Sequence, residues 1–179
     1  MNNMKKDHDG ERILEEINQT LGKTGEKPRE ELISEIEQAK RVFIAGAGRS
    51  GLVGRMFAMR LSHLGKEVHI AGSTLCPPIG PGDLLIAISS SGKTGTTLLH
   101  GRTAKKASAR IAAITGSKTS PLARLADRTM VIPAGPTIQP GNSLFEQASL
   151  ILLDTVILRY QQSQRIPPSR LKKRHANLE

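Results

Sequence analysis

A hydroxyl-rich junction between a strand and a helix is the strongest chemical signal in this sequence. Leu84 to Ile88 is an unbroken apolar run typical of a buried strand, and Ser89-Ser90-Ser91-Gly92-Lys93-Thr94 follows it directly. Hydroxyl groups, a glycine that lets the backbone approach closely, and the free amides of a following helix all donate hydrogen bonds to an anion. One hydroxyl would be enough to cap that helix. Four hydroxyls in six positions predict a phosphate site formed by Ser89, Ser90, Ser91, Gly92 and Thr94.

The end of this junction also matches part of another phosphate loop. Gly92-Lys93-Thr94 fits the last three positions of G-x-x-x-x-G-K-[ST], the loop of nucleoside triphosphatases. The first glycine of that motif would fall at Ala87, inside the strand. The loop would then be too short to wrap a pyrophosphate, so we do not expect a nucleotidase.

A second glycine-rich turn, Gly46-Ala47-Gly48-Arg49-Ser50-Gly51, lies between another apolar strand and a helix. It fits the dinucleotide-binding pattern G-x-G-x-x-G, which also needs an acidic residue at the end of the next strand. The segment Ile70-Ala71-Gly72-Ser73 offers none, so a nicotinamide enzyme is disfavoured. Arg49 remains as a positive charge for an anion. Ser50 either caps the helix or donates to the ligand, and the pattern leaves both open.

The elements that hold these turns predict an α/β fold. Two amphipathic helices, over about 11–21 and 28–40, precede short apolar strands that alternate with helices, which is typical of parallel strands with crossover helices. We expect a five-stranded, parallel, doubly wound sheet, in which ligands bind at the carboxyl ends of the strands. The expected strands are 42–45, 67–71, 84–88, 111–115 and 130–132, and the expected crossover helices are 50–64, 94–107 and 120–126.

The length fits one domain, 1–179, with N-terminal helices over 1–40, an α/β core over 41–160 and a C-terminal arm over 161–179. The last core helix, about 143–160, is apolar on nearly every face. A helix of that kind is buried on all sides, so we expect a homo-oligomer, a dimer or tetramer, in which a second subunit covers it. The arm carries Pro167-Pro168 and a basic cluster, and we expect it to lie outside the core.

Composition and charge narrow the partners and the compartment. The 179 residues include 26 Lys and Arg against 16 Asp and Glu, a net charge of +10, but only 2% are aromatic. Few rings are available to stack on bases, so we expect no nucleic acid but attraction of a small anionic substrate. Cys76 is the sole cysteine, which excludes a disulfide or a cysteine metal site. No stretch reaches the roughly 18 apolar residues of a membrane span, so we expect no membrane partner and a cytoplasmic location.

Three titratable residues could move protons. Ser143-x-x-Glu146 opens the last helix, so on pattern alone Glu146 is either half of a capping box or a catalytic carboxylate. His63 lies 13 residues after Ser50, about 20 Å away along one helix, and we expect it to pack at a subunit contact. His175 lies in the tail, where a lone histidine is usually solvated.

Five segments carry a resemblance to a known family: FIAGAGRSG (43–51), FAMRLSHLG (57–65), DLLIAISSSGKT (83–94), TIQPGNSLFEQ (137–147) and HANLE (175–179). With them the chain resembles the 6-phospho-3-hexuloisomerases of the sugar isomerase (SIS) family over nearly its whole length from Ile13. The resemblance implies a flavodoxin-like SIS domain that binds a phosphorylated ketohexose.

The resemblance also implies a reaction, the conversion of D-arabino-3-hexulose 6-phosphate to fructose 6-phosphate through a 2,3-enediol in the ribulose monophosphate pathway of formaldehyde fixation. It makes Glu146 the base that moves a proton between C2 and C3. Similar SIS isomerases bring a tail histidine into a neighbour's site, which implies that His175 acts in trans as an acid or base. Neither a metal nor a redox cofactor is needed. Functional coupling to a hexulose-6-phosphate synthase is implied as well.

Two other functions remain open. Another SIS isomerase, such as arabinose 5-phosphate isomerase, would use the same serine loop. A non-catalytic phosphosugar sensor would bind the ligand without needing Glu146, but it would need an output element, and the sequence shows neither a helix-turn-helix nor a second domain for one. We therefore favour a cofactor-independent isomerase.

Overall fold

Five parallel strands form the central sheet of the computed structural model, which describes residues 8–175 and 177. Their order is β2-β1-β3-β4-β5, the flavodoxin-like arrangement of doubly wound folds. The middle strand β3 is buried at every position, as its continuous apolar sequence predicts. The expected α/β class and all five strands are confirmed. The bounds are β1 Val42–Gly46, β2 Val68–Ile70, β3 Leu84–Ser89, β4 Arg110–Thr115 and β5 Arg128–Val131.

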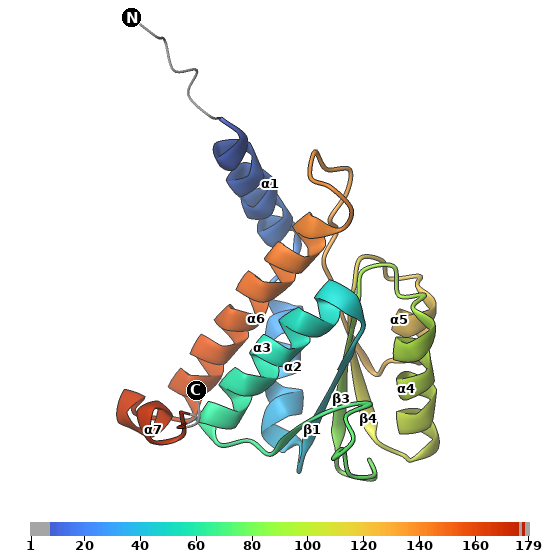
Figure 1. Ribbon diagram of the computed structural model, residues 1–179, viewed down its shortest axis with the longest axis vertical. Coiled ribbons are helices and arrows are strands. Elements are labelled where there is room, and N and C mark those ends of the chain that lie inside the picture. The colour runs from blue at the N-terminus through green and yellow to red at the C-terminus, as the bar shows by residue number, and fades with distance from the viewer. Residues whose placement is uncertain (1–7, 176, 178–179) are drawn as a thin grey trace, which may run out of the picture.

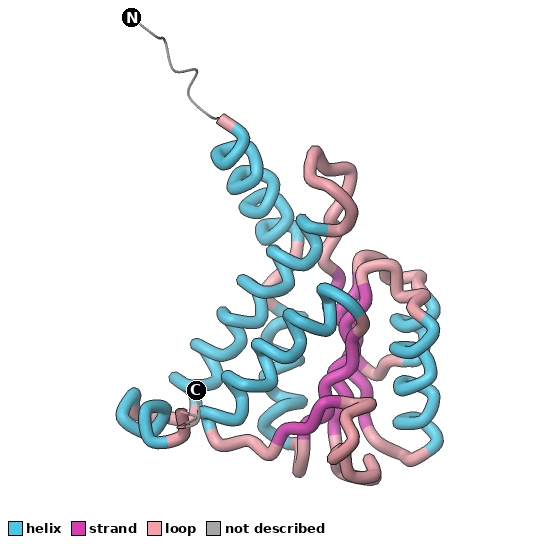
Figure 2. Tube along the Cα trace, in the orientation of Figure 1, coloured by secondary structure: helices cyan, strands magenta, loops and turns pink. Residues whose placement is uncertain are grey.

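Helices cover both faces of the sheet (Figures 1 and 2). One layer consists of α2 (Lys27–Gln38), α3 (Gly48–Leu64) and α6 (Ser143–Ser163), and the other of α4 (Gly95–Lys106) and α5 (Pro121–Leu125). The chain therefore leaves β1 toward one face and leaves β3 toward the other. This makes the gap between the carboxyl ends of β1 and β3 the topological switch point, where ligands of such sheets bind.

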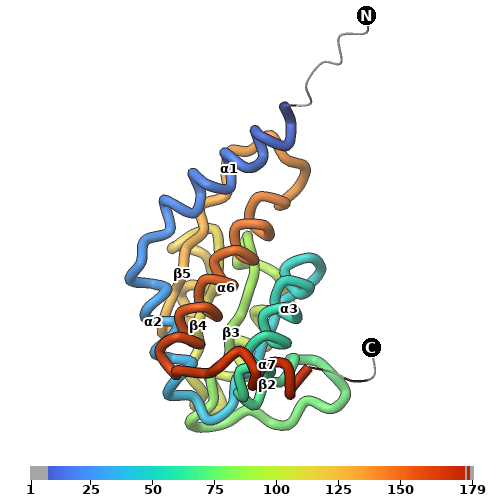
Figure 3. The backbone as a smooth tube through the Cα atoms, turned by 90° about the vertical axis from the view of Figure 1, so that its left-hand side faces the viewer, coloured from blue at the N-terminus to red at the C-terminus, as the bar shows by residue number. Residues whose placement is uncertain are grey.

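Two further helices lie along the first layer. The first, α1 (Asp9–Lys23), runs beside α6, and α7 (Pro168–Lys173) lies at the C-terminal end of α3 (Figure 3). No helix in the part of the chain that the structure describes is long and apolar enough to cross a membrane.

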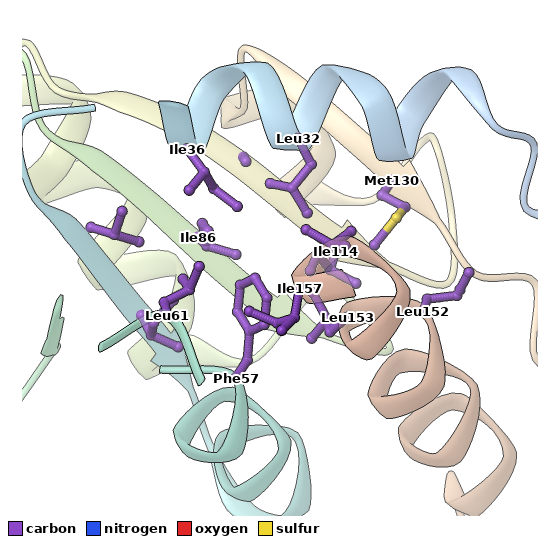
Figure 4. Close-up of a cluster of buried hydrophobic side chains, with 14 of the residues drawn as sticks. Leu32, Ile36, Phe57, Leu61, Ile86, Ile114, Met130, Leu152, Leu153 and Ile157 are labelled. Carbon is purple, nitrogen blue, oxygen red and sulfur yellow. The ribbon is translucent and has the colours of Figure 1, made fainter. Parts of the chain in front are cut away.

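The larger core cluster fills the space between the sheet and the α2, α3 and α6 layer. Figure 4 shows side chains of these three helices converging on Ile86 of β3 and Ile114 of β4. The cluster is almost entirely aliphatic, as the low aromatic content predicts. Removing a buried Leu or Ile side chain from such a core costs about 2–5 kcal/mol. Its labelled helical members are Leu32, Ile36, Phe57, Leu61, Leu152, Leu153 and Ile157.

Local signals place several helix ends correctly. Gly65 follows α3 in the left-handed conformation, φ +100°, which glycine adopts at helix ends. Ser120 caps α5, because its hydroxyl accepts a hydrogen bond from the amide of Ala123 at 3.2 Å, and Pro121 occupies the first helical position. Both ends agree with the sequence prediction.

The C-terminal arm is the main correction to the expected fold. The last core helix does not stop near Tyr160 but continues to Ser163, and Ile166, only 9% exposed, joins the large core cluster. Leu171 of α7 also packs against that cluster. An arm that buries apolar side chains is part of the fold, so the expectation that it lies outside the core is wrong.

Candidate active site

The β3–α4 loop folds around the hydroxyl of Ser89. Its Oγ accepts a hydrogen bond from the amide of Gly92 at 3.1 Å and lies 3.0 Å from Oγ1 of Thr94. The Oγ of Ser91 accepts one from the amide of Lys93 at 3.2 Å. Ser89 is buried and Ser91 is exposed. The buried hydroxyl thus shapes the loop, while the hydroxyl of Ser91 stands where a ligand can reach it.

Gly92 allows this loop to rest on the turn after β4. It has a φ of +61°, and a Cβ there would collide with Ser120 and lie 2.9 Å from Oγ1 of Thr115. The amide of Gly116 donates a hydrogen bond to the carbonyl of Ser90 at 2.9 Å. The amide of Leu122 donates one to the carbonyl of Gly92 at 3.1 Å. Glycine is therefore required both by the backbone conformation and by the close approach, and the loop is held rigidly.

The N-terminus of α4 adds donors to the same place. Thr94 is the N-cap residue in an extended conformation, and its side chain makes no capping hydrogen bond. The first amides of a helix have no acceptor within the helix, and they carry the positive end of its dipole. An anion seated against Ser91 and Thr94 would satisfy them, which supports the predicted phosphate site.

A cavity of about 710 Å³ opens beside the loop. Three consecutive strand ends supply its walls, and two cationic side chains, Lys93 and Arg124, lie among hydroxyl groups there. A pocket of this chemistry suits a phosphorylated, polyhydroxylated ligand. The lining comprises Ser90, Ser91 and Lys93 after β3, Gly116, Ser117, Thr119, Ser120, Pro121 and Arg124 after β4, and Pro133, Ala134 and Gly135 after β5.

The sequence analysis missed the contribution of the turns after β4 and β5. The residues Ser117, Thr119 and Arg124 belong to no motif that points to phosphate. Their position was nevertheless a usable signal, because they follow a predicted strand at the edge of the sheet where ligands bind.

The glycine turn after β1 lies next to the serine loop. In the sheet, Gly46 of β1 pairs with Ile88 of β3, so the two turns leave neighbouring strands at the same edge. The helix α3 begins at Gly48, with Ala47 as N-cap residue, and Ser50 lies inside its first turn. The interpretation of Ser50 as a helix cap is therefore wrong, and its hydroxyl remains a candidate donor to the ligand.

Arg49 connects this turn to the start of α6. Its Nε lies 2.6 Å from Oε2 of Glu146, and its Nη2 donates a hydrogen bond to Oγ of Ser143 at 2.9 Å. The Glu146 side chain is only 12% exposed. Its Oε2 accepts no hydrogen bond within the described chain, so the contact with Arg49 is an ion pair.

Glu146 does not complete a capping box. The N-cap residue of α6 is Asn142, and no side chain caps this helix. The hydroxyl of Ser143 donates to the carbonyl of Pro140 at 2.9 Å, where a capping box would have it accept from the amide of Glu146. The capping interpretation is therefore wrong, and the carboxylate faces the Arg49 turn.

His63 and His175 lie together, far from Glu146. The rings have centroids 5.1 Å apart, tilted by 30°, and His63 is 6% exposed whereas His175 is exposed. His63 lies in the last turn of α3, the end opposite to Arg49, and His175 follows α7, which packs against α3. A helix of this length separates its ends by roughly 20–25 Å. Within one chain, the structure therefore does not bring His175 to the predicted site.

No group of three or more His, Cys, Asp or Glu side chains within residues 8–175 is placed to hold a metal ion. Cys76 is partly buried, and its thiol lies 3.6 Å from the carbonyl of Pro77.

Comparison with known proteins decides the family. A family model described as the SIS domain matches residues 35–159. The chain belongs to the SIS domain family. This SIS domain is 43% identical over 175 residues to the 3-hexulose-6-phosphate isomerase of Mycobacterium gastri, covering 93% of this chain and 88% of that protein. It is 36% identical over 176 residues to the enzyme of the same name from Bacillus subtilis (strain 168), with 93% and 95% covered.

Among solved structures, this SIS domain is similar to a hypothetical protein of Methanococcus jannaschii for which a molecular function of 3-hexulose-6-phosphate isomerase has been inferred. The two share 35% sequence identity and a TM-score of 0.88, over 96% of this chain and 99% of the other.

Proposed function

We propose that this protein interconverts D-arabino-3-hexulose 6-phosphate and fructose 6-phosphate. Relatives at 43% and 36% identity, matched over most of their length, are named 3-hexulose-6-phosphate isomerase. The observation that carries the proposal is the Glu146 carboxylate, almost buried beside Arg49 and with an Oε2 that accepts no hydrogen bond within the described chain. A sensor would have no use for such a group.

The reaction moves a carbonyl from C3 to C2. A base removes the proton from C2 of the 3-hexulose, which leaves a 2,3-enediol, and a proton is then returned to C3 while the hydroxyl proton passes from O2 to O3. One carboxylate can perform both carbon transfers, because it is protonated by the first and deprotonated by the second. We assign this role to Glu146. Arg49, in contact with that carboxylate, places a positive charge where the enediolate forms.

The phosphate anchors the substrate away from the reacting carbons. Ser91, Thr94 and the first amides of α4 supply the donors, and Ser50 completes the set from the neighbouring turn. Ser89 and Ser90 take part through the shape of the loop, since the Ser89 hydroxyl is bonded within it. Binding of the phosphate, away from the reacting carbons, positions C2 and C3 of the sugar next to the base.

A second copy of the chain would complete the site. Apolar side chains on two neighbouring helices stand exposed, namely Leu52, Met56 and Met59 on α3 and Ile151 and Leu158 on α6. Exposed apolar patches of this kind mark protein interfaces. We propose that a homo-oligomer covers them and that His175 of one subunit enters the site of another, where it assists proton transfer between the sugar oxygens. Coupling to a hexulose-6-phosphate synthase belongs to the same proposal.

A coupled assay tests the activity. Hexulose phosphate is generated from formaldehyde and ribulose 5-phosphate by a separate synthase, and fructose 6-phosphate is measured. Turnover that depends on this protein is the expected result. Turnover of arabinose 5-phosphate alone would identify a different SIS isomerase, and binding of both sugars without turnover would identify a sensor.

A further inference from the structure

The carboxylate of Glu16, on α1, holds the segment that leads into α6. Its Oε2 accepts hydrogen bonds from Oγ1 of Thr137 at 2.7 Å and Nε2 of Gln139 at 3.1 Å, and its Oε1 accepts one from the amide of Ile138 at 2.9 Å. The bonds from Ile138 and Thr137 hold the pKa of the Glu16 carboxyl below its usual value. Three consecutive residues are thus tied to one charged group.

These contacts continue to the candidate base. The amide of Gln139 donates to Oγ1 of Thr137 at 3.0 Å, and the next carbonyl, that of Pro140, accepts from the hydroxyl of Ser143 at 2.9 Å. Ser143 in turn accepts from Arg49, whose Nε touches Glu146. A chain of polar contacts therefore runs from α1 through residues 137–143 to the Arg49 and Glu146 pair.

The residues just before this segment line the large cavity. Pro133 and Gly135 line that cavity on one side. On the other side they line a small space of about 70 Å³ next to Glu16, together with Pro136 and Leu144. The loop between β5 and α6 therefore begins at the cavity and ends at the helix that carries Glu146.

We infer that Glu16 is a positioning residue of the active site: it fixes residues 137–139, and thereby the Ser143 and Arg49 contacts that orient Glu146. The inference rests on the proposed role of Glu146 as the base. Glu16 does not line the large cavity and touches no group in the proton transfer. Because a misplacement of about 1 Å can cost on the order of 10²-fold in rate, loss of this clamp lowers kcat.

The phosphate loop is held separately, which gives the inference its distinguishing readout. Backbone hydrogen bonds and Gly92 fix that loop to the turn after β4, and the Glu16 side chain takes part in none of these contacts. Loss of the Glu16 clamp therefore leaves KM and inhibition by inorganic phosphate unchanged. A purely structural tether would instead change stability without singling out kcat.

The first experiment compares Glu16→Ala with Glu15→Ala. Glu15 lies next to it on α1, is exposed and accepts a bond only from Gln19 of the same helix, so its replacement removes an equivalent carboxylate from the same helix. For Glu16→Ala we expect kcat to fall on the order of tenfold or more, with KM and the phosphate inhibition constant within about twofold. Glu15→Ala keeps the wild-type kcat.

The second experiment exchanges the partners. Gln139→Glu alone sets two carboxylates against each other and breaks the clamp. Adding Glu16→Gln restores a pair of one carboxylate and one amide donor. The carboxylate is then at position 139 and the amide at position 16. We expect kcat to fall in Gln139→Glu and to recover most of its loss in the double variant. This pair of variants decides the question if Glu16→Ala does not fold.

A folded Glu16→Ala enzyme with wild-type kcat overturns the inference. The inference is also overturned if the double variant does not recover the kcat lost in Gln139→Glu. It is overturned too if KM changes by as large a factor as kcat. The assignment of Glu146 as the base fails by a different result, namely wild-type turnover by Glu146→Gln, and the proposed function fails if the wild-type protein does not turn over hexulose phosphate in the coupled assay. A dead Glu146→Gln variant beside a fully active Glu16→Ala variant would remove the positioning role alone.

Discussion

Arg49 and Glu146 form an ion pair that bridges the glycine turn after β1 and the first turn of α6. The Nε to Oε2 distance is 2.6 Å, with the carboxylate 12% exposed and the guanidinium side chain 58% exposed. The carboxylate is thus sheltered, while the side chain of its partner is largely open to solvent.

We expect Ser91 to bind the phosphate in both the substrate and the transition state. A hydrogen bond to a charged group contributes about 1.5–3 kcal/mol, so Ser91→Ala raises KM on the order of tenfold with little change in kcat. Steady-state kinetics and inhibition by inorganic phosphate measure this. The control is Ser73→Ala, an exposed serine in the turn after the edge strand β2. An unchanged KM and unchanged phosphate inhibition would remove Ser91 from the site.

Gly92 is needed for both the fold of the loop and phosphate binding. Gly92→Ala adds a Cβ at a φ of +61° against Ser120, and the left-handed backbone alone costs a non-glycine residue about 1–2 kcal/mol. We expect a lower melting temperature and a raised KM. Gly95→Ala is the matched control, because a Cβ there meets nothing within 4 Å. Equal behaviour of the two variants would contradict the loop geometry described above.

The proposed trans role of His175 predicts complementation. His175→Ala and Glu146→Gln are each expected to have low kcat as pure oligomers. Mixed and refolded together, they form oligomers in which some sites combine an intact Glu146 with an intact His175 of the other subunit, so activity returns. Because the two residues lie far apart within one chain, no recovery in mixtures that demonstrably exchange subunits would end the trans assignment.

Asp83 makes stability depend on acid. It is 2% exposed and accepts hydrogen bonds from Nε of Arg41 at 3.1 Å, Nη2 of Arg41 at 2.7 Å and the amide of Gly80 at 2.8 Å. Burial raises the pKa of the Asp83 carboxyl, but these hydrogen bonds lower it further, and its folded-state pKa lies below the ordinary value. The ion pair therefore stabilises the fold fully above the unfolded-state pKa of about 3.9, and this stabilisation is lost as pH falls below that value.

The measurement is the free energy of unfolding of wild type and Asp83→Asn in denaturant between about pH 7 and 3. We expect the variant to be less stable at neutral pH and the gap to narrow as the pH drops. Asp154→Asn, an exposed site on α6, is the control. A gap that stays constant over this range would show that Asp83 does not titrate with a lowered pKa.

Local rules were enough to predict the sheet and the strand–loop–helix junction that contains the serines. Apolar runs such as Leu84 to Ile88 mark strands, and Ser120 with Pro121 marks a helix start, because each signal lies within a few residues of the structure that it specifies. The hydroxyl cluster after β3 was informative for the same reason.

The rest depends on contacts between distant residues. Thr137 lies 121 positions from its partner Glu16, and Ser143 lies 94 positions from Arg49. Neither periodicity nor a motif encodes such pairs, so the Ser143-x-x-Glu146 pattern suggested a local cap where the structure has a long-range ion pair. Ile166 was misjudged similarly, since its burial comes from the core formed by earlier helices.

The most direct test of the central claim is Glu146→Gln in deuterated water. Gln keeps the size and polarity of the side chain but cannot accept the C2 proton, so kcat falls on the order of 10²–10⁴-fold with little change in KM or melting temperature. Wild type incorporates deuterium at C2 or C3 of the sugar, the variant does not, and Glu15→Gln, at an exposed site on α1, behaves as wild type. Near-normal turnover or deuterium incorporation by Glu146→Gln would contradict the assignment of Glu146 as the base.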